Sequence, residues 1–211
     1  VGGILDNSVY RIEYLTNNTL INNNIITCAY KNKIKYFLNI GSSCMYPFNI
    51  SGYLDENMIN DGKLEPTNEG HAFSKLYSSK LCTFITEDNK NFFYKTLIPC
   101  NLYGDNDNFN LESSHFIPAI IKKISLAKLQ NRKEVIVWGD GKPRREIMHV
   151  QDLSDGIIFC IKKFEKMPNI LNIGPGSDLK IIDYYKIVSK ILNHKTKFVY
   201  DLSKPNGMKR K

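Results

Sequence analysis

The stretch that decides the fold is Ile34-Lys35-Tyr36-Phe37-Leu38-Asn39-Ile40, followed directly by Gly41-Ser42-Ser43-Cys44-Met45-Tyr46-Pro47. The mainly apolar run predicts a buried parallel strand, and it ends abruptly in two hydroxyls and a thiol. Open α/β sheets place their ligands at the carboxyl ends of their strands. The sequence therefore predicts that Ser42, Ser43 and Cys44 lie at a ligand site.

Two further segments carry groups that exchange protons. The segment 65–75 contains His71 and Lys75, whose i, i+4 spacing puts both on one face of a predicted helix. Glu112-Ser113-Ser114-His115 supplies a second imidazole. Hydroxyl, thiol, imidazole and lysine groups together suggest proton-transfer chemistry.

Outward from these segments, helical and strand patterns alternate along the chain. The alternation predicts an α/β fold with a mainly parallel sheet and helices on both faces. The expected helices cover 13–32, 70–88, 116–130, 149–163 and 181–192, and the expected strands cover 34–40, 92–99, 134–139, 171–174 and 197–200. The connection 47–69 is long for a structureless loop, which suggests a role in an active site.

Composition narrows the class of protein. The chain has 211 residues and a net charge of +8, but its lysines are scattered, which indicates a solvated surface rather than nucleic-acid binding. Its five cysteines are an odd number without a CxxC pair, so reduced thiols in the cytoplasm are expected rather than disulfides or a metal site. No apolar run is long enough to predict a membrane span.

Several motifs in register resemble one family, the GDP-L-fucose synthases of the extended short-chain dehydrogenase/reductase (NAD-dependent epimerase/dehydratase) superfamily. The resemblance covers essentially the whole chain. The matching segments are 41–47, 64–75, 99–104, 114–118, 137–150, 171–176 and 201–207.

The resemblance implies a Rossmann-like doubly wound parallel sheet and NADP-dependent 3,5-epimerisation and 4-reduction of GDP-4-keto-6-deoxy-mannose. Residues 1–104 would be the C-terminal part of the NADP-binding domain. Residues 105–211 would be a smaller substrate-binding region, interleaved with the Rossmann sheet and truncated at its end. A homodimer is implied as well.

The resemblance also implies roles for single residues. Cys44 would be the base and His115 the acid of epimerisation, Ser42 would bind the C4 oxygen, and Lys75 would reach the nicotinamide ribose. Taken alone, each has a plainer interpretation: a buried thiol, a capping histidine, a strand-end serine that satisfies a turn, or a solvated lysine. Cofactor contacts are expected from Ile40, Gly41, Ser42, Ser43, Lys75, Pro99, Cys100, Asn101, Leu102 and His115.

For the GDP moiety, the matching positions are Lys123, Trp138 and Arg145. Arginine grips phosphate in a planar fork, and the indole offers a stacking face. Lys123 stands where the family commonly has arginine, so bidentate binding is lost there. Core packing is the alternative for Trp138, and Arg144 is the alternative to Arg145.

The sequence departs from the family in two places. A glycine-rich pyrophosphate fingerprint is expected ahead of Val1, so the sequence looks like an internal fragment that alone would bind NADP weakly or not at all. The catalytic tyrosine, four residues before the lysine, is here His71. Three interpretations stay open for His71: a residual or lost reductase, a working histidine acid, and a sequence variant or error.

Three hypotheses for the whole protein follow. The first is an epimerase/reductase that makes GDP-L-fucose or a related GDP-deoxysugar. The second is an epimerase with an impaired reductase, because the phenol is missing at His71. The third is a non-catalytic fragment, or a piece that only binds a nucleotide sugar.

Overall fold

The computed structural model describes residues 4–50, 52–204 and 206–210. Its main sheet has the order β1-β2-β7, built from β1 (Tyr36–Ile40), β2 (Phe93–Pro99) and β7 (Ile170–Ile173). Both pairings are parallel, with Asn39 opposite Thr96 and Leu97 opposite Leu171. The predicted parallel sheet is therefore confirmed.

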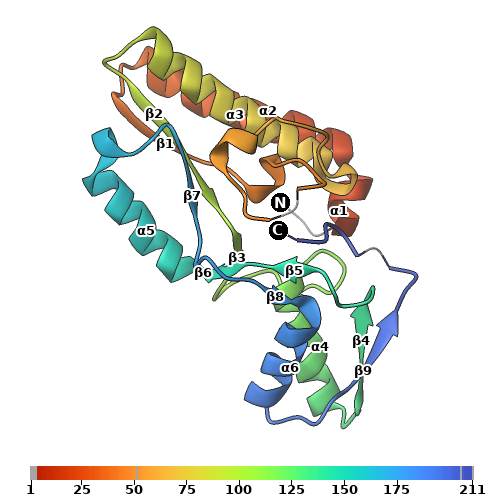
Figure 1. Cartoon of the computed structure of the whole chain (residues 1–211). Coiled ribbons are helices and arrows are strands. Elements are labelled where there is room, and N and C mark those ends of the chain that lie inside the picture. The colour runs from red at the N-terminus through yellow and green to blue at the C-terminus, as the bar shows by residue number, and fades with distance from the viewer. Residues whose placement is uncertain (1–3, 51, 205, 211) are drawn as a thin grey trace.

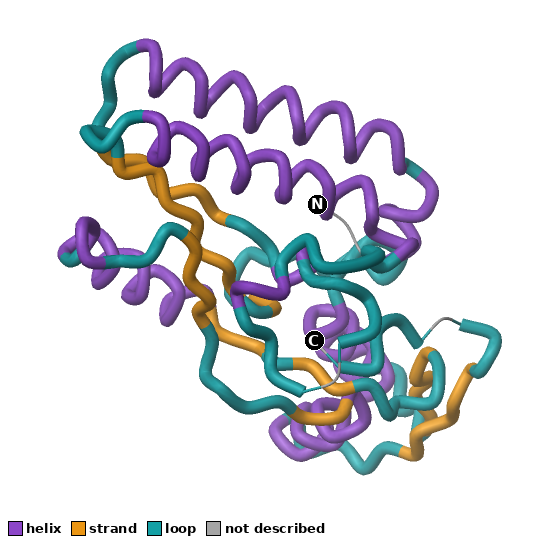
Figure 2. Tube along the Cα trace, turned by 45° about the horizontal axis from the view of Figure 1, so that its top comes forward, coloured by secondary structure: helices purple, strands orange, loops and turns teal. Residues whose placement is uncertain are grey.

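Helices cover both faces of this sheet, as the alternation predicted (Figure 1). On one face, α2 (Arg11–Lys31) and α3 (Glu69–Asp88) lie side by side, and Ile26, Cys82 and Tyr94 pack between them and the strands. On the other face, α5 (Val150–Lys162) packs Leu153 and Cys160 against Leu97. The tube view shows the two long helices running along the sheet together (Figure 2).

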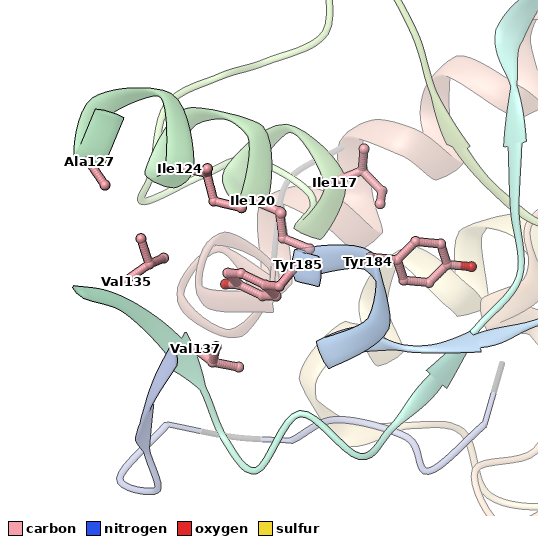
Figure 3. Close-up of a cluster of buried hydrophobic side chains, with 8 residues drawn as sticks. All are labelled: Ile117, Ile120, Ile124, Ala127, Val135, Val137, Tyr184 and Tyr185. Atoms are coloured by element: carbon pink, nitrogen blue, oxygen red, sulfur yellow. The ribbon is translucent and has the colours of Figure 1, made fainter. Parts of the chain in front are cut away.

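A second group of elements has a core of its own (Figure 3). It contains α4 (Phe116–Leu129), β4 (Glu134–Trp138), α6 (Ile181–Ile191) and β9 (Lys197–Asp201), with β4 and β9 paired in parallel. Its buried side chains are Ile117, Ile120, Ile124, Ala127, Val135, Val137, Tyr184 and Tyr185. This core fixes α4, which carries His115 at its start.

Short strands join the two groups, and the sequence patterns did not predict them. The strand β3 (Asn101–Tyr103) pairs in parallel with β6 (Ile147–His149), whereas β5 (Arg144–Arg145) pairs antiparallel with β8 (Leu179–Lys180). A short helix α1 (Ile4–Val9) was also missed. Elements of two or three residues are too short to show a period, so only their pairing defines them.

Most expected boundaries agree with the structure to within two residues. The expected strand 34–40 begins later, at Tyr36, because the end of α2 captures the residues before it. Lys33 adopts a positive φ of 58°, and the Ile34 N–H donates to the Ala29 carbonyl. Lys33 and Ile34 thus complete the helix terminus, and pairing with β2 begins at the Lys35 carbonyl, which accepts the Phe93 N–H at 2.7 Å.

Candidate functional site

A cavity of about 430 Å³ lies at the carboxyl ends of β1 and β2, between the first turns of α3 and α4. Every residue predicted for the site lines it. They are Ile40, Gly41, Ser42, Ser43, Cys44, His71, Lys75, Pro99, Cys100, Asn101, Leu102, His115, Lys123, Trp138 and Arg145. The structure therefore brings together side chains that lie as far apart in the chain as residues 40 and 145.

Ser42 and Cys44 are held by a tight turn directly after β1. Residues Ser43–Met45 form one turn of 3-10 helix, and the Ser42 hydroxyl caps it by accepting the Cys44 N–H at 3.4 Å. The Cys44 thiol donates to the same Ser42 oxygen at 3.0 Å. Because this oxygen accepts both bonds, its own proton remains for a ligand oxygen in the cavity.

The helix α3 brings His71 and Lys75 to the same cavity, one turn apart and on one face. The Lys75 ammonium donates to the Ile40 carbonyl at 2.8 Å, at the end of β1. Burial lowers the pKa of Lys75, and the charge of a Cys44 thiolate would oppose that shift. The two side chains are therefore electrostatically coupled. His71 is buried, with 8% of its surface exposed.

His115 stands at the N-cap position of α4, and its carbonyl accepts the Ala119 N–H at 3.1 Å. Its side chain forms no capping hydrogen bond to α4, although its backbone occupies the capping position. The ring lines the same cavity as the Cys44 thiol, which is 2% exposed. A thiol and an imidazole, 71 positions apart in the chain, thus face one shared space.

Further cations line the cavity wall. The Lys123 ammonium lies 4.8 Å from the centre of the Trp138 ring and donates to the Ile136 carbonyl at 3.1 Å. Burial lowers the pKa of Lys123 to about 8. A second ammonium, from Lys204, lies 5.3 Å from the same ring. Trp138 is therefore a half-buried residue whose ring contacts cations, and it is not fully buried in the core.

Arg145 is a buried cation of the cavity wall, and Arg144 does not belong to that wall. The Arg145 guanidinium donates to the Met208 carbonyl at 2.7 Å, and burial lowers its pKa to about 10. Arg144 instead forms an ion pair with Asp178 at 2.6 Å and does not line the cavity. The structure thus favours Arg145 over its neighbour as the cavity residue.

Sequence reasoning missed several polar residues of the cavity wall. Glu65 is 5% exposed and accepts the Thr67 N–H at 3.1 Å, and its charge opposes the pKa shift of Arg145. Asn206 accepts the Asp140 N–H at 2.8 Å through its side-chain oxygen. Asn68 and Ser114 also line the cavity. Glu65, Asn68 and Ser114 could have been predicted from the sequence. They lie within the segments 65–75 and 112–115, close to residues that were predicted for the site.

A second thiol on the cavity, Cys100, differs from Cys44 in its surroundings. Burial raises the pKa of Cys100 to about 12, so this side chain stays a neutral thiol near pH 7. All five cysteines are free. Among the described residues, no group of three His, Cys, Asp or Glu side chains could hold a metal ion.

The donor set fits the nicotinamide end of a dinucleotide. A ribose diol and a carboxamide would suit the hydroxyls after β1, the Lys75 ammonium and Asn101 at the start of β3. None of the helices in the described ranges is both long and apolar enough to cross a membrane. Fold and cavity together define an α/β protein of the Rossmann type with proton-transfer groups at its strand ends.

Residues 1–174 match the family described as "NAD dependent epimerase/dehydratase family". The chain belongs to this family, and it is an enzyme of that class. It is 49% identical over 211 residues to a GDP-L-colitose synthase from Yersinia pseudotuberculosis, and 41% identical to a GDP-L-fucose synthase from Azorhizobium caulinodans. In both comparisons the whole chain aligns, and it spans 68% and 67% of the two relatives.

A solved structure shows the same fold. A GDP-L-fucose synthetase from Naegleria fowleri bound to NADP superposes with a TM-score of 0.86 at 26% identity. The superposition covers 96% of this chain and 64% of that one. The Rossmann-like class that the sequence predicted is therefore confirmed.

Proposed function

We propose that the protein epimerises GDP-4-keto-6-deoxy-mannose at C3 and C5 and reduces it at C4 with NADPH, giving GDP-L-fucose. One observation carries this proposal: Cys44 and His115 line a single cavity together with Ser42 and Lys75. The names of the relatives support the nucleotide sugar, and the NADP-bound relative supports the cofactor. A cytoplasmic enzyme with reduced thiols is part of the same proposal.

Epimerisation needs a proton taken from one face of the sugar and another delivered to the opposite face. Cys44, as a thiolate, takes the proton from the carbon next to the C4 ketone, and the electron pair moves onto the C4 oxygen. Ser42 donates a hydrogen bond from its hydroxyl to that oxygen, which stabilises the charge. His115 then delivers a proton to the other face of the same carbon. Thiol and imidazole suit this exchange because their ordinary pKa values lie on either side of neutrality.

Reduction uses the other pair of side chains. NADPH, when bound, supplies the hydride that reduces C4. Lys75 would hold the nicotinamide ribose, and His71 would give its proton to the C4 oxygen. Lys123, Trp138 and Arg145 would bind the GDP moiety, with the cations matched to its diphosphate.

Two observations favour second candidates. His71 in place of the family tyrosine favours an epimerase whose reductase step is slow, because an imidazole is shorter than a phenol and a nearby lysine disfavours its charged form. The relative that is 49% identical is named for GDP-L-colitose, which favours that sugar as the alternative product.

The test is incubation of the ketosugar with NADPH in deuterated water. We expect deuterium at both C3 and C5, seen by mass spectrometry and NMR, together with oxidation of NADPH. Deuterium without NADPH oxidation would identify the epimerase with an impaired reductase. If neither signal appears with either sugar, the protein is a non-catalytic or purely binding piece and the proposal is wrong.

A further inference from the structure

A buried polar network links three elements beneath the cavity without touching it. Asn39, the residue before the last in β1, is 6% exposed, although its neighbours in the strand are apolar. Its side-chain amide donates to the Ser78 hydroxyl on α3 and to the Thr96 hydroxyl on β2, both at 3.2 Å. Ser78 and Thr96 are completely buried. A buried polar side chain costs stability unless it is paired, and this one is paired to both neighbouring elements.

The network ends on the backbone of Lys75. The Ser78 hydroxyl, which accepts from Asn39, donates its own proton to the Lys75 carbonyl at 2.9 Å. The Lys75 side chain donates to the carbonyl of Ile40, the residue directly after Asn39. The Lys75 carbonyl is thus linked to Asn39 through Ser78, and the Lys75 ammonium is bonded to Ile40. Because Asn39 and Ile40 are consecutive in β1, these hydrogen bonds close a ring.

We propose that Asn39 and Ser78 are positioning residues that set where the Lys75 ammonium stands in the cofactor end of the cavity. This ring of hydrogen bonds fixes the distance between α3 and β1 at the position of Lys75. Without it, apolar packing alone would hold the helix, and such packing has no direction. This inference rests on the proposed role of Lys75 at the nicotinamide ribose.

The helix itself supplies a matched control. Ser79 follows Ser78, is 3% exposed, and its hydroxyl finds no hydrogen-bond partner among the residues that the structure describes. Ser78→Ala and Ser79→Ala remove the same atom from neighbouring buried positions. Only the first removes a bond to Lys75 and to Asn39.

The experiment compares the two variants in full-length protein by the dissociation constant for NADPH. We expect Ser78→Ala to raise this constant about fivefold, the usual effect of losing one hydrogen bond, here the one between a displaced Lys75 ammonium and the cofactor, and Ser79→Ala to leave it unchanged. In Ser78→Ala, deuterium exchange at C3 and C5 should fall by a smaller factor than NADPH binding, because the Cys44 thiol is bonded to Ser42 and interacts with Lys75 only through charge. In Ser79→Ala, exchange should stay at the wild-type rate. A merely structural defect would weaken binding and exchange together.

Thr96→Val is the second variant, because valine has nearly the shape of threonine and cuts the other bond of Asn39. Thr96→Val should raise the dissociation constant for NADPH by a smaller factor. It also keeps the inference testable if Ser78→Ala does not fold. Equal NADPH constants for Ser78→Ala, Ser79→Ala and wild type would overturn the inference. Absence of NADPH binding or of exchange in the wild type would instead overturn the proposed function, so the two failures are distinct.

Discussion

At the scale of single residues, His71 separates the two enzymatic hypotheses. It occupies the position four residues before Lys75, on the same face of α3, and lines the cavity. His71→Tyr introduces the phenol that the resemblance to the family implies at this position. We expect the rate of NADPH oxidation to rise about 100-fold or more, the usual size of a general-acid effect. Stopped-flow absorbance of NADPH measures this rate.

Deuterium exchange is the control for His71→Tyr, and it should not change. A rate that falls, or stays level, would mean that the histidine is itself a working acid. The interpretation as a residual or lost reductase would then be wrong.

Lys123 gives the cavity a pH dependence with a definite sign. Burial lowers its pKa from the usual 10.5 to about 8, so the ammonium is charged below about pH 8 and neutral above it. A neutral amine no longer attracts the diphosphate of the substrate. We expect KM for the nucleotide sugar to rise severalfold between about pH 7 and about pH 9.

Lys123→Arg should remove this rise, since arginine stays charged throughout the range and can bind phosphate through two bonds. The exposed neighbour provides the control: Lys122→Arg should keep the wild-type profile. A KM that does not depend on pH in the wild type would show that Lys123 makes no contact with the diphosphate.

At the scale of elements, a buried lysine holds the end of α5 to the sheet. Lys95, on β2, is 3% exposed, and its ammonium donates to the carbonyls of Phe164 and Met167, the first at 2.6 Å. Lys95→Met keeps the length of the side chain but removes the ammonium donor from both carbonyls, and the Phe164 carbonyl keeps only the Met167 N–H. We expect a loss of about 2 kcal/mol in the free energy of unfolding, measured by urea denaturation.

The matched substitution at an exposed position, Lys90→Met, should change the stability by less than about 0.5 kcal/mol. If Lys95→Met were as stable as Lys90→Met, the three-residue turn after α5 would not depend on this lysine.

The elements also show what the sequence could and could not predict. The long helices and the strands of the main sheet follow from apolar periodicity. The position of Cys44 after a strand indicated a ligand site, whereas the roles of Cys44 and His115 came from the resemblance to the family. The pairs β3–β6 and β5–β8 were missed, because pairing across more than thirty residues leaves no local pattern. Asn39 was missed for a related reason: a polar residue within an apolar strand reveals its partners only in three dimensions.

At the scale of the whole molecule, α2 and α3 expose several large apolar side chains to solvent. Leu20, Ile21 and Ile25 on α2 are each more than half exposed, and Phe73 and Phe84 on α3 are each 48% exposed. We propose that a second copy of the chain covers these helices in a homodimer, an area of about 800 Å² per partner being typical. Light scattering of the wild type should give the mass of a dimer.

Phe84→Asp should shift that mass toward the monomer, because it places a charge in the interface. Phe109→Asp is the control, since Phe109 is 39% exposed in the connection between β3 and α4. A monomeric wild type would contradict the dimer. The division of the molecule between residues 104 and 105 into a cofactor domain and a substrate region stays a prediction.

We expect the thiol of Cys44 and the imidazole of His115 to exchange protons on opposite faces of one ketosugar. The decisive measurement is NMR of the ketosugar in deuterated water with the variants Cys44→Ala and His115→Ala, each checked for substrate binding. Cys44→Ala should lose deuterium uptake by at least about 100-fold, whereas His115→Ala should still take up deuterium but no longer invert C3 and C5. Wild-type inversion in either variant would contradict the account.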